Sequence, residues 1–220
     1  MYGCMGCLIN SISSRLERWK GSTPFATTTF MTKLEQANHC RTALLSLIDK
    51  NVSHSALIEA CKSVLNHPKF MSAFGGTTHH AYEGGLAVHT FEVTSYALGM
   101  AQMIPQANLE VLVTAAIFHD YMKIREYTPQ YMGSSLGGQN IPIKTPYRQL
   151  VRHVAGSHAE FLKAISGTLV PEGIVIAIEH AMLAHHGKYE HGSPIEPQLI
   201  EAYILHYADN FSKHFGEGRK

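Results

Sequence analysis

Histidine and aspartate side chains recur along this 220-residue chain at positions that could hold metal ions. The chain has 15 histidines, spread through the sequence rather than gathered in a tag. Those that fall at the ends or on the faces of expected helices, together with two aspartates, are His89, the His119-Asp120 pair, His153, the His185-His186 pair and Asp209. Imidazole and carboxylate suit Mn, Fe, Zn or Mg, and helices hold such ligands stiffly. The pattern therefore indicates a metal site.

The adjacent pair His119-Asp120 is the most informative part of this set. It follows the apolar run Leu109–Phe118, which reads as a helix capped by Asn108. A carboxylate without a partner at the end of such a helix would be costly to bury, and a bound metal removes that cost. A single histidine on an apolar face is more often a core residue, so the prediction rests on the ordered set.

The elements that must position these residues read as helices. Periodic apolar residues and capping signals predict helices over the ranges 33–49, 54–66, 86–104, 109–118, 145–165 and 171–186, and a last one after Pro197. Residues 121–144 contain several glycines and prolines and are expected to form a long irregular loop, which is usually functional in a compact domain. Strand patterns are nearly absent, so the predicted fold class is all-α.

Composition bounds the kind of protein. The chain is 45% apolar with a net charge of +1, which fits a globular domain without a global basic field for nucleic acid. No apolar run reaches the roughly 18 residues of a membrane span. Residues 1–30 are expected to be a peripheral arm, with disorder as an open alternative, and residues 31–220 a single domain. The cysteines, including the lone C-x-x-C of Cys4 and Cys7, are expected to be reduced thiols of a cytoplasmic protein.

Three stretches of the chain share a motif order with a known family. They are His80-Ala81-Tyr82-Glu83-Gly84-Gly85-Leu86 followed by His89-Thr90, then His119-Asp120-Tyr121-Met122-Lys123-Ile124, and finally His185-His186-Gly187, Gly192-Ser193-Pro194, Glu201-Ala202 and His206 through Asp209. Over residues 74–213 the order H…HD…H…HH…D resembles the two-metal signature of the HD superfamily of metal-dependent phosphohydrolases. The local stretches are similar to the HD domain of YhaM-type 3′–5′ exoribonucleases. Met122 and Arg152 stand where that family has glycine.

The resemblance implies an HD-domain helical bundle with a metal site at its centre. It implies that a first metal is held by His89, His119, Asp120 and Asp209, and a second by Asp120, His153, His185 and His186. Mn²⁺ is the first choice of ion, with Fe, Mg²⁺, Zn²⁺ or Ni²⁺ as alternatives. Asp120 and Lys123 are the predicted catalytic residues, since phosphoryl transfer needs a cationic helper. The predicted substrate-binding residues are His80, Lys123, Arg125 and Arg152.

The expected function is hydrolysis of a phosphate ester of a nucleotide or of a nucleic-acid 3′ end. The expected partner is a nucleotide or a short single-stranded nucleic acid, with no membrane; assembly into a homo-oligomer is left open. One alternative is a single-metal nucleotide phosphohydrolase of the dNTP type, and another is a non-catalytic nucleotide-binding HD module. YhaM-type enzymes carry an oligonucleotide-binding barrel before the HD domain, and residues 1–73 here read as too helical for one.

Overall fold

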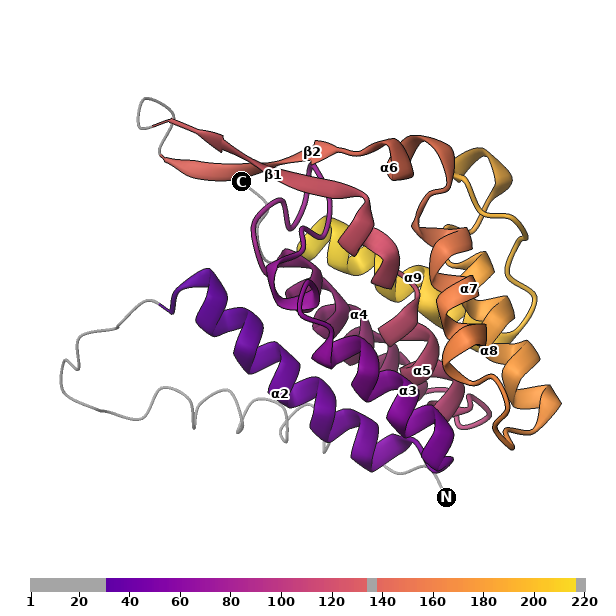
Figure 1. The fold of residues 1–220 in the computed structure, drawn as a ribbon. Helices are drawn as coiled ribbons and strands as arrows, with labels where there is room; N and C mark the ends of the chain where they lie inside the picture. The colour runs from indigo at the N-terminus through magenta and orange to yellow at the C-terminus, as the bar shows by residue number, and fades with distance from the viewer. Residues whose placement is uncertain (1–30, 134–137, 217–220) are drawn as a thin grey trace, which may run out of the picture. The chain divides into compact units, whose positions relative to one another are not determined.

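The computed structural model of the chain describes residues 31–133 and 138–216. The expected arm of residues 1–30 and its C-x-x-C lie outside the described residues, so the domain boundary expected at residue 30 stays a prediction. The described α-helices are α2 (Lys33–Asn51), α3 (Ser55–Asn66), α4 (Gly85–Ala101), α5 (Leu109–Phe118), α6 (Pro146–Leu150), α7 (His153–Ala164), α8 (Glu172–Ala184) and α9 (Ile200–Phe215), with the 3₁₀ turns η1 (Phe70–Ser72), η2 (Tyr121–Arg125) and η4 (Tyr189–His191) (Figure 1). The predicted all-α class is confirmed.

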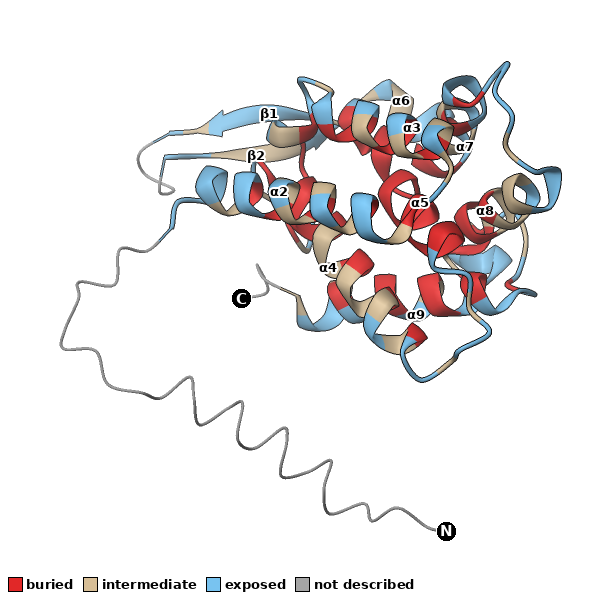
Figure 2. Ribbon diagram, turned by 90° about the horizontal axis from the view of Figure 1, so that it is seen from below, coloured by how far each residue is buried: buried red, intermediate tan, exposed pale blue. Residues whose placement is uncertain are grey.

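Helix α5 lies in the middle of the bundle, where Figure 2 shows it buried among the other helices. It begins as expected at Asn108, whose side chain accepts hydrogen bonds from the N–H groups of Glu110 and Val111. Apart from Glu110 and Thr114 its residues are apolar on every side, which is typical of a helix surrounded by protein. The helix therefore carries His119 and Asp120, the residues that follow it, into the interior. Within the described ranges, no helix combines the length and the apolar character needed to cross a membrane.

The start of helix α4 explains the glycine pair in the first motif. Gly84 precedes the helix with a φ of +86°, a conformation that side-chain-bearing residues rarely adopt. A Cβ added to Gly85 would lie 2.1 Å from the carbonyl oxygen of His80, so only glycine allows the preceding loop to pack this closely. The two glycines thus fix the helix that presents His89 to the interior.

The prediction of an irregular loop over residues 121–144 is wrong. After the turn η2 the chain forms an antiparallel hairpin of β1 (Tyr127–Met132) and β2 (Gln139–Lys144), which extends from the body in Figure 1. Pro129 stands opposite Pro142 in this ladder. Proline cannot donate a ladder hydrogen bond, but a two-stranded ribbon has outward-facing positions where none is needed. The prolines that indicated a loop are therefore compatible with strands.

The helix predicted over residues 145–165 is broken in two. Thr145 caps its start as expected, accepting a hydrogen bond from the Arg148 N–H. The N–H groups of Val151 and Arg152 then both donate to the carbonyl of Tyr147, which ends α6. Helix α7 begins afresh at His153 because a buried carboxylate, described below, accepts the His153 N–H. A contact distant in sequence therefore overrides the local helical pattern.

Candidate metal centre

The predicted metal-binding residues come together in the interior of the bundle. They are His89 from α4, His119 and Asp120 after α5, His153 at the start of α7, His185 and His186 after α8, and Asp209 on α9. Their ligand atoms form two groups, in each of which all atoms lie within 4.8 Å of one another: the first is His89, His119, Asp120 and Asp209, and the second is His153, His185 and His186. All seven are buried except His186, which is half-buried. That these seven residues bind metal ions stays a proposal.

Asp120 lies between the two groups. Its Oδ2 is 3.0 Å from Nε2 of His89 and 3.4 Å from Nε2 of His119, both in the first group. Its Oδ1 is 3.1 Å from Nε2 of His153 and 3.9 Å from Nε2 of His185, both in the second group. Each carboxylate oxygen therefore faces a different group, which is the arrangement of a bridging ligand.

Backbone carbonyls fix the protonation of two of these imidazoles. Nδ1 of His119 is 2.7 Å from the carbonyl oxygen of Ala116, and Nδ1 of His185 is 2.6 Å from that of Met182. A carbonyl oxygen can only accept, so both Nδ1 atoms carry the proton. The Nε2 lone pairs then point into the centre, as metal-binding histidines require.

Carboxylates fix the other two buried imidazoles. Nδ1 of His153 donates to Oε1 of Glu126 at 2.9 Å, and the same oxygen accepts the His153 N–H at 2.6 Å. Nδ1 of His89 is 2.8 Å from Oγ of Ser212. The Ser212 hydroxyl donates to Oε2 of Glu92 at 2.7 Å, so its oxygen accepts from His89. The carboxylates thus orient one histidine in each group.

Sequence reasoning did not identify these supporting residues. Glu126 is fully buried and its Oε2 lies 3.2 Å from Nε of Arg148. The only signal for it in the sequence is its position three residues after Lys123. Ser212 and Glu92 have no signal at all, because they meet His89 only through the packing of α9 against α4.

The donor set fits divalent cations. Nε2 of His89 lies 3.4 Å from Nε2 of His119, and Nε2 of His153 lies 3.3 Å from Nε2 of His186. Both oxygens of Asp120 are buried, and the cation Lys123 reaches only Oδ2. Lone pairs that converge in this way repel each other and lack the solvation they had in water. A cation among them removes both penalties.

The electrostatics favour the forms that bind metals. Burial alone would raise the pKa of Asp120, but Lys123 and the imidazoles of His119 and His153 outweigh it and hold the pKa well below its usual range. Burial and the neighbouring imidazoles lower the pKa of His185 far below its usual value, and burial with His153 lowers that of His186 to about 3. At neutral pH the carboxylate is therefore ionised and both imidazoles are neutral, as metal binding requires.

The pKa of His89 moves in the opposite direction. Burial lowers it, but hydrogen bonds from the imidazole to Asp120 and Asp209 outweigh burial and raise it. Two carboxylates thus favour an extra positive charge at this imidazole. Asp209 itself has a lowered pKa: burial raises it, and Lys213 with His89 outweighs that effect. The first group therefore attracts a cation.

Lys123 belongs to the interior and not to the solvated surface. Its Nζ is 2.5 Å from Oδ2 of Asp120 and 2.7 Å from the carbonyl oxygen of Gly75, and the residue is 6% exposed. The Lys123 ammonium, the cationic helper expected from the sequence, thus lies within the metal centre. A catalytic role for Lys123 stays a prediction.

Two other predicted substrate-binding residues lie around the centre in different ways. His80 is fully buried, with its Nε2 3.1 Å from Oε2 of Glu92, so it supports the carboxylate that orients Ser212. Arg125 is exposed, and its guanidinium carbon lies 4.2 Å from the centroid of the Tyr147 ring. Substrate contact by either residue stays a prediction.

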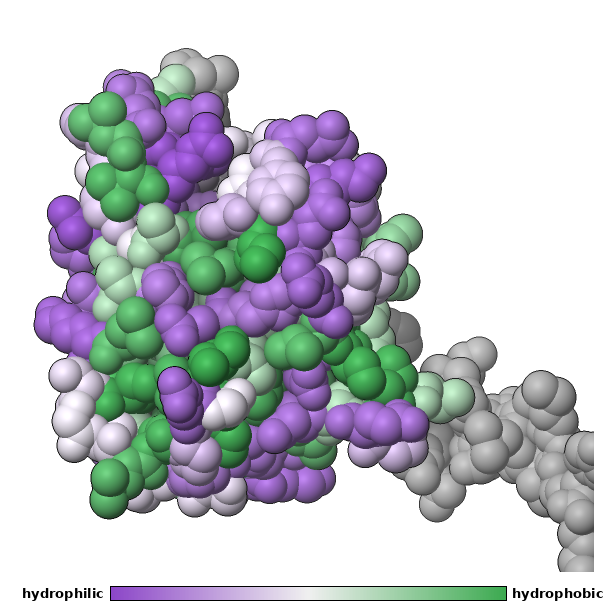
Figure 3. All heavy atoms as spheres, turned by 90° about the vertical axis from the view of Figure 1, so that its right-hand side faces the viewer, coloured by the Kyte–Doolittle hydropathy of each residue, from purple (hydrophilic) through white to green (hydrophobic). Residues whose placement is uncertain are grey.

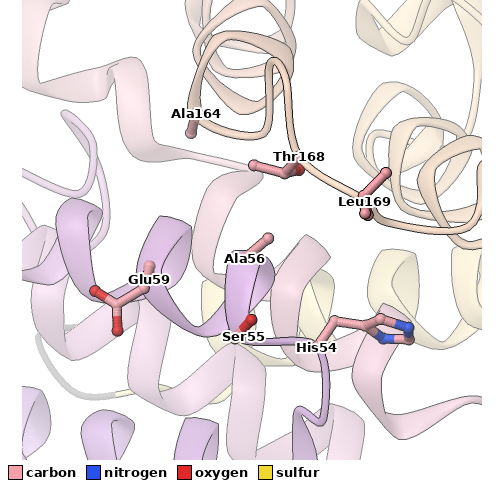
Figure 4. A pocket seen from close by; sticks show the side chains of 7 residues that line it. All are labelled: His54, Ser55, Ala56, Glu59, Ala164, Thr168 and Leu169. Carbon is pink, nitrogen blue, oxygen red and sulfur yellow. The ribbon is translucent and has the colours of Figure 1, made fainter.

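A separate hollow lies at the other end of α5. Figure 4 shows its lining residues His54, Ser55, Ala56, Glu59, Ala164, Thr168 and Leu169. His54 pairs with Glu110 in the first turn of α5, whereas His119 follows its last turn. The ten residues of the helix separate the two ends by about 15 Å. None of the residues of the metal centre lines this hollow.

Glu126→Gln is expected to weaken metal binding in the second group about 10- to 100-fold, as is typical when a carboxylate behind a metal-binding histidine is lost. The amide keeps the shape of the side chain but removes the charge that holds the proton on Nδ1 of His153. Titration calorimetry with Mn²⁺ measures the change. Glu190→Gln alters an exposed glutamate and is the control. An unchanged Mn²⁺ affinity in Glu126→Gln would contradict the positioning role.

Comparisons with known proteins identify the family of the chain. Residues 86–213, more than half of the chain, match the HD domain family. Over 135 residues the chain is 33% identical to the 3′-5′ exoribonuclease YhaM of Bacillus subtilis (strain 168), which covers 60% of this chain and 39% of that protein. The proteins of the same name from Bacillus velezensis and Geobacillus sp. are 33% and 32% identical over the same share of this chain, covering 39% and 38% of their own lengths.

The chain thus spans about two fifths of the length of these curated relatives. No solved structure matches it. The predicted family and the likeness to YhaM-type exoribonucleases are confirmed by the family match and by these relatives. The chain belongs to the HD domain family.

Proposed function

We propose that this protein is a metal-dependent phosphodiesterase that uses two divalent ions to hydrolyse phosphate esters of a nucleotide or of a nucleic-acid 3′ end. The observation that carries the proposal is Asp120, whose two oxygens face two separate groups of imidazoles. The HD domain match and the exoribonuclease relatives support a hydrolase acting on phosphoester bonds. Mn²⁺ is the first ion to test, because this mixture of imidazole and carboxylate suits several divalent metals.

The residues of the centre have definable tasks in such a reaction. Divalent ions bound here would activate water and offset the negative charge on the phosphoryl oxygens. The buried carboxylate of Asp120 supplies the charge that holds both positions together. The Lys123 ammonium, 2.5 Å from Asp120, adds a positive charge beside the phosphoryl group as the ester bond breaks. The backbone carbonyls behind His119 and His185 keep their Nε2 atoms free of protons.

The two alternatives predict different arrangements. A single-metal phosphohydrolase needs only the first group, and it gives no reason for three further imidazoles to gather within 4.8 Å of one another. A binding module has no need for two aspartates buried among five imidazoles in its interior. The second group of histidines therefore favours the two-metal hydrolase.

A substrate panel tests the proposal. The purified chain, reloaded with Mn²⁺, is assayed against short RNA, short single-stranded DNA, nucleoside triphosphates, and cyclic mono- and dinucleotides. We expect mononucleotides to be released from the 3′ end of one of the single strands, and no release in EDTA. Hydrolysis of triphosphates alone would favour the dNTP-type alternative. Tight binding of a nucleotide without any hydrolysis would favour the binding module.

The hairpin β1–β2 is expected to act as a rim or lid for the substrate. Both ends of the hairpin are anchored beside the centre, because the Thr145 N–H donates to the carbonyl of Glu126 at 2.9 Å. Replacing residues 133–138, part of which lies outside the described residues, with Asn-Gly shortens the hairpin and keeps a tight turn. We expect KM for a single-stranded substrate to rise about 5- to 10-fold, by loss of contacts worth about 1 kcal/mol.

Metal content and the rate on a small phosphodiester serve as controls for the shortened hairpin. Both should stay unchanged, since no residue of the two ligand groups is altered. Unaltered kinetics on every substrate would contradict the lid.

A cytoplasmic location and assembly into a homo-oligomer remain part of the proposal. Cys61 is a buried free thiol, as expected for reducing surroundings. On the side of the molecule seen in Figure 3, hydrophobic patches are interspersed with hydrophilic ones. The exposed apolar side chains of α7, α8 and the loop between them include Leu162, Leu169 and Ile176.

A further inference from the structure

We propose that Arg152 forms a subsite for a second phosphate of the substrate, next to the phosphate that is hydrolysed. This inference rests on the proposed function and narrows it to substrates with more than one phosphate. Four observations carry it: the place of the guanidinium, its lack of a protein partner, the backbone conformation of Arg152, and a polar hollow beside it.

The guanidinium lies beside His186, the outermost histidine of the second ligand group. A Cβ added to Gly192 would lie 3.1 Å from Nη1 of Arg152 and 3.8 Å from Nδ1 of His186, so both side chains flank this glycine. On its other side, Nε2 of His186 is 3.3 Å from Nε2 of His153. A phosphate group in the centre would therefore have Arg152 just outside it.

The guanidinium is free to bind an external anion. The other cations around the centre are engaged: Lys123 with Asp120, Lys213 with Asp209, Arg148 with Glu126, and Arg125 over the ring of Tyr147. Arg152 is exposed, and within the described part of the chain no protein group forms a hydrogen bond or an ion pair with its side chain. Arginine binds phosphate with two parallel hydrogen bonds, which makes it suited to this task.

The backbone of Arg152 is strained. Its φ of 65° and ψ of 160° fall in a region that glycine occupies almost alone. The conformation follows from the break between α6 and α7, which places the His153 N–H on Glu126. Any residue with a side chain is less stable than glycine in this conformation, and the guanidinium forms no bond to the described residues that would offset the loss. Such strain is characteristic of functional sites.

A polar hollow of about 360 Å³ shares the side chain of His186 with this position. It is lined by His186, His191, Asn210 and Lys213. Two of these residues belong to or touch the metal centre, since His186 is in the second group and Lys213 pairs with Asp209. The hollow leaves room for the rest of a nucleotide substrate to extend from the metal centre toward Arg152. A second phosphate, from a nucleic-acid strand or from a nucleoside polyphosphate, is the chemistry that this surface fits.

Dinucleotides that differ only in phosphate number test the subsite. Wild-type protein with Mn²⁺ is assayed on NpN, pNpN and NpNp, and on a nucleoside triphosphate to separate the two sources of a second phosphate. We expect a preference for one phosphorylated dinucleotide over NpN. Arg152→Ala should raise KM for that dinucleotide about tenfold, because a solvent-exposed arginine–phosphate contact is lost, and leave NpN unchanged. Arg152→Lys should recover part of the loss.

A second substitution separates the charge from the strain. Arg152→Gly should have the same KM defect as Arg152→Ala, but it should raise Tm by about 2–5 °C because glycine adopts this conformation freely. Arg152→Ala keeps the strain and should not raise Tm. Lys163→Ala removes an exposed positive charge from the far end of α7 and is the control for net charge.

The outcomes separate this inference from the proposed function. Hydrolysis of all three dinucleotides at equal efficiency, unchanged in Arg152→Ala, would overturn the subsite and leave the phosphodiesterase intact. A lower Tm in Arg152→Gly would show that the guanidinium supports the fold and would also overturn it. Failure of metal-loaded wild type to hydrolyse any substrate would overturn the proposed function and the subsite with it.

Discussion

Replacing Asp120 with alanine is expected to abolish hydrolysis and to remove metal binding from both groups. One carboxylate faces both sets of imidazoles, through Oδ2 toward His89 and through Oδ1 toward His153. The loss should exceed the roughly 10- to 100-fold effect typical of residues behind the ligands, because a direct and shared ligand is removed. Turnover on the best substrate and metal content by mass spectrometry measure the two effects.

The stability of the Asp120 variant needs its own measurement. Alanine leaves the ammonium of Lys123 buried without its carboxylate partner, and breaking a buried pair costs about 3–5 kcal/mol. Asp120→Asn keeps the shape and a hydrogen-bond acceptor for Lys123, so it should fold as the wild type does and still be inactive. Asp49→Ala, which alters an exposed aspartate on α2, is the control. Near-wild-type turnover in either Asp120 variant would place the active site elsewhere.

Metal stoichiometry is expected to distinguish two ions from one. Wild-type protein purified without chelator and reloaded with Mn²⁺ should carry about two ions per chain, one for each ligand group. The double variant His153→Ala with His185→Ala should carry about one, since the ligands of the first group are unchanged. Activity should fall when the second ion is lost, because one metal cannot stabilise both the attacking and the leaving oxygen.

The chain offers a matched control for this double variant. His158 lies on α7, the helix that begins at His153, and His180 lies on α8, the helix that His185 follows. Neither side chain points into the metal centre, because His158 bonds to Glu179 and His180 accepts the Gln198 N–H. His158→Ala with His180→Ala should therefore keep two ions and full activity. One ion in the wild type, together with full activity of His153→Ala/His185→Ala, would make the single-metal hydrolase the better account.

The sequence by itself determined the features that depend on local chemistry. Asn108 caps α5 because its side chain reaches N–H groups two and three residues ahead. The apolar run that follows makes α5 a buried helix, so the position of His119 and Asp120 in the interior could be predicted. The order of histidines and aspartates was sufficient to recognise the family, because residue type and spacing do not depend on how the helices pack.

Only the tertiary structure decided which groups support these residues. Glu126 lies 27 residues from His153, and Ser212 lies 123 residues from His89, so no local pattern announces either contact. The same kind of contact broke a predicted helix at Arg152, because the Glu126 carboxylate accepts the His153 N–H and starts α7 there. Local propensities differ by less than about 1 kcal/mol per residue, whereas a buried hydrogen bond to a charged group contributes about 1.5–3 kcal/mol. Where the two compete, the distant contact prevails.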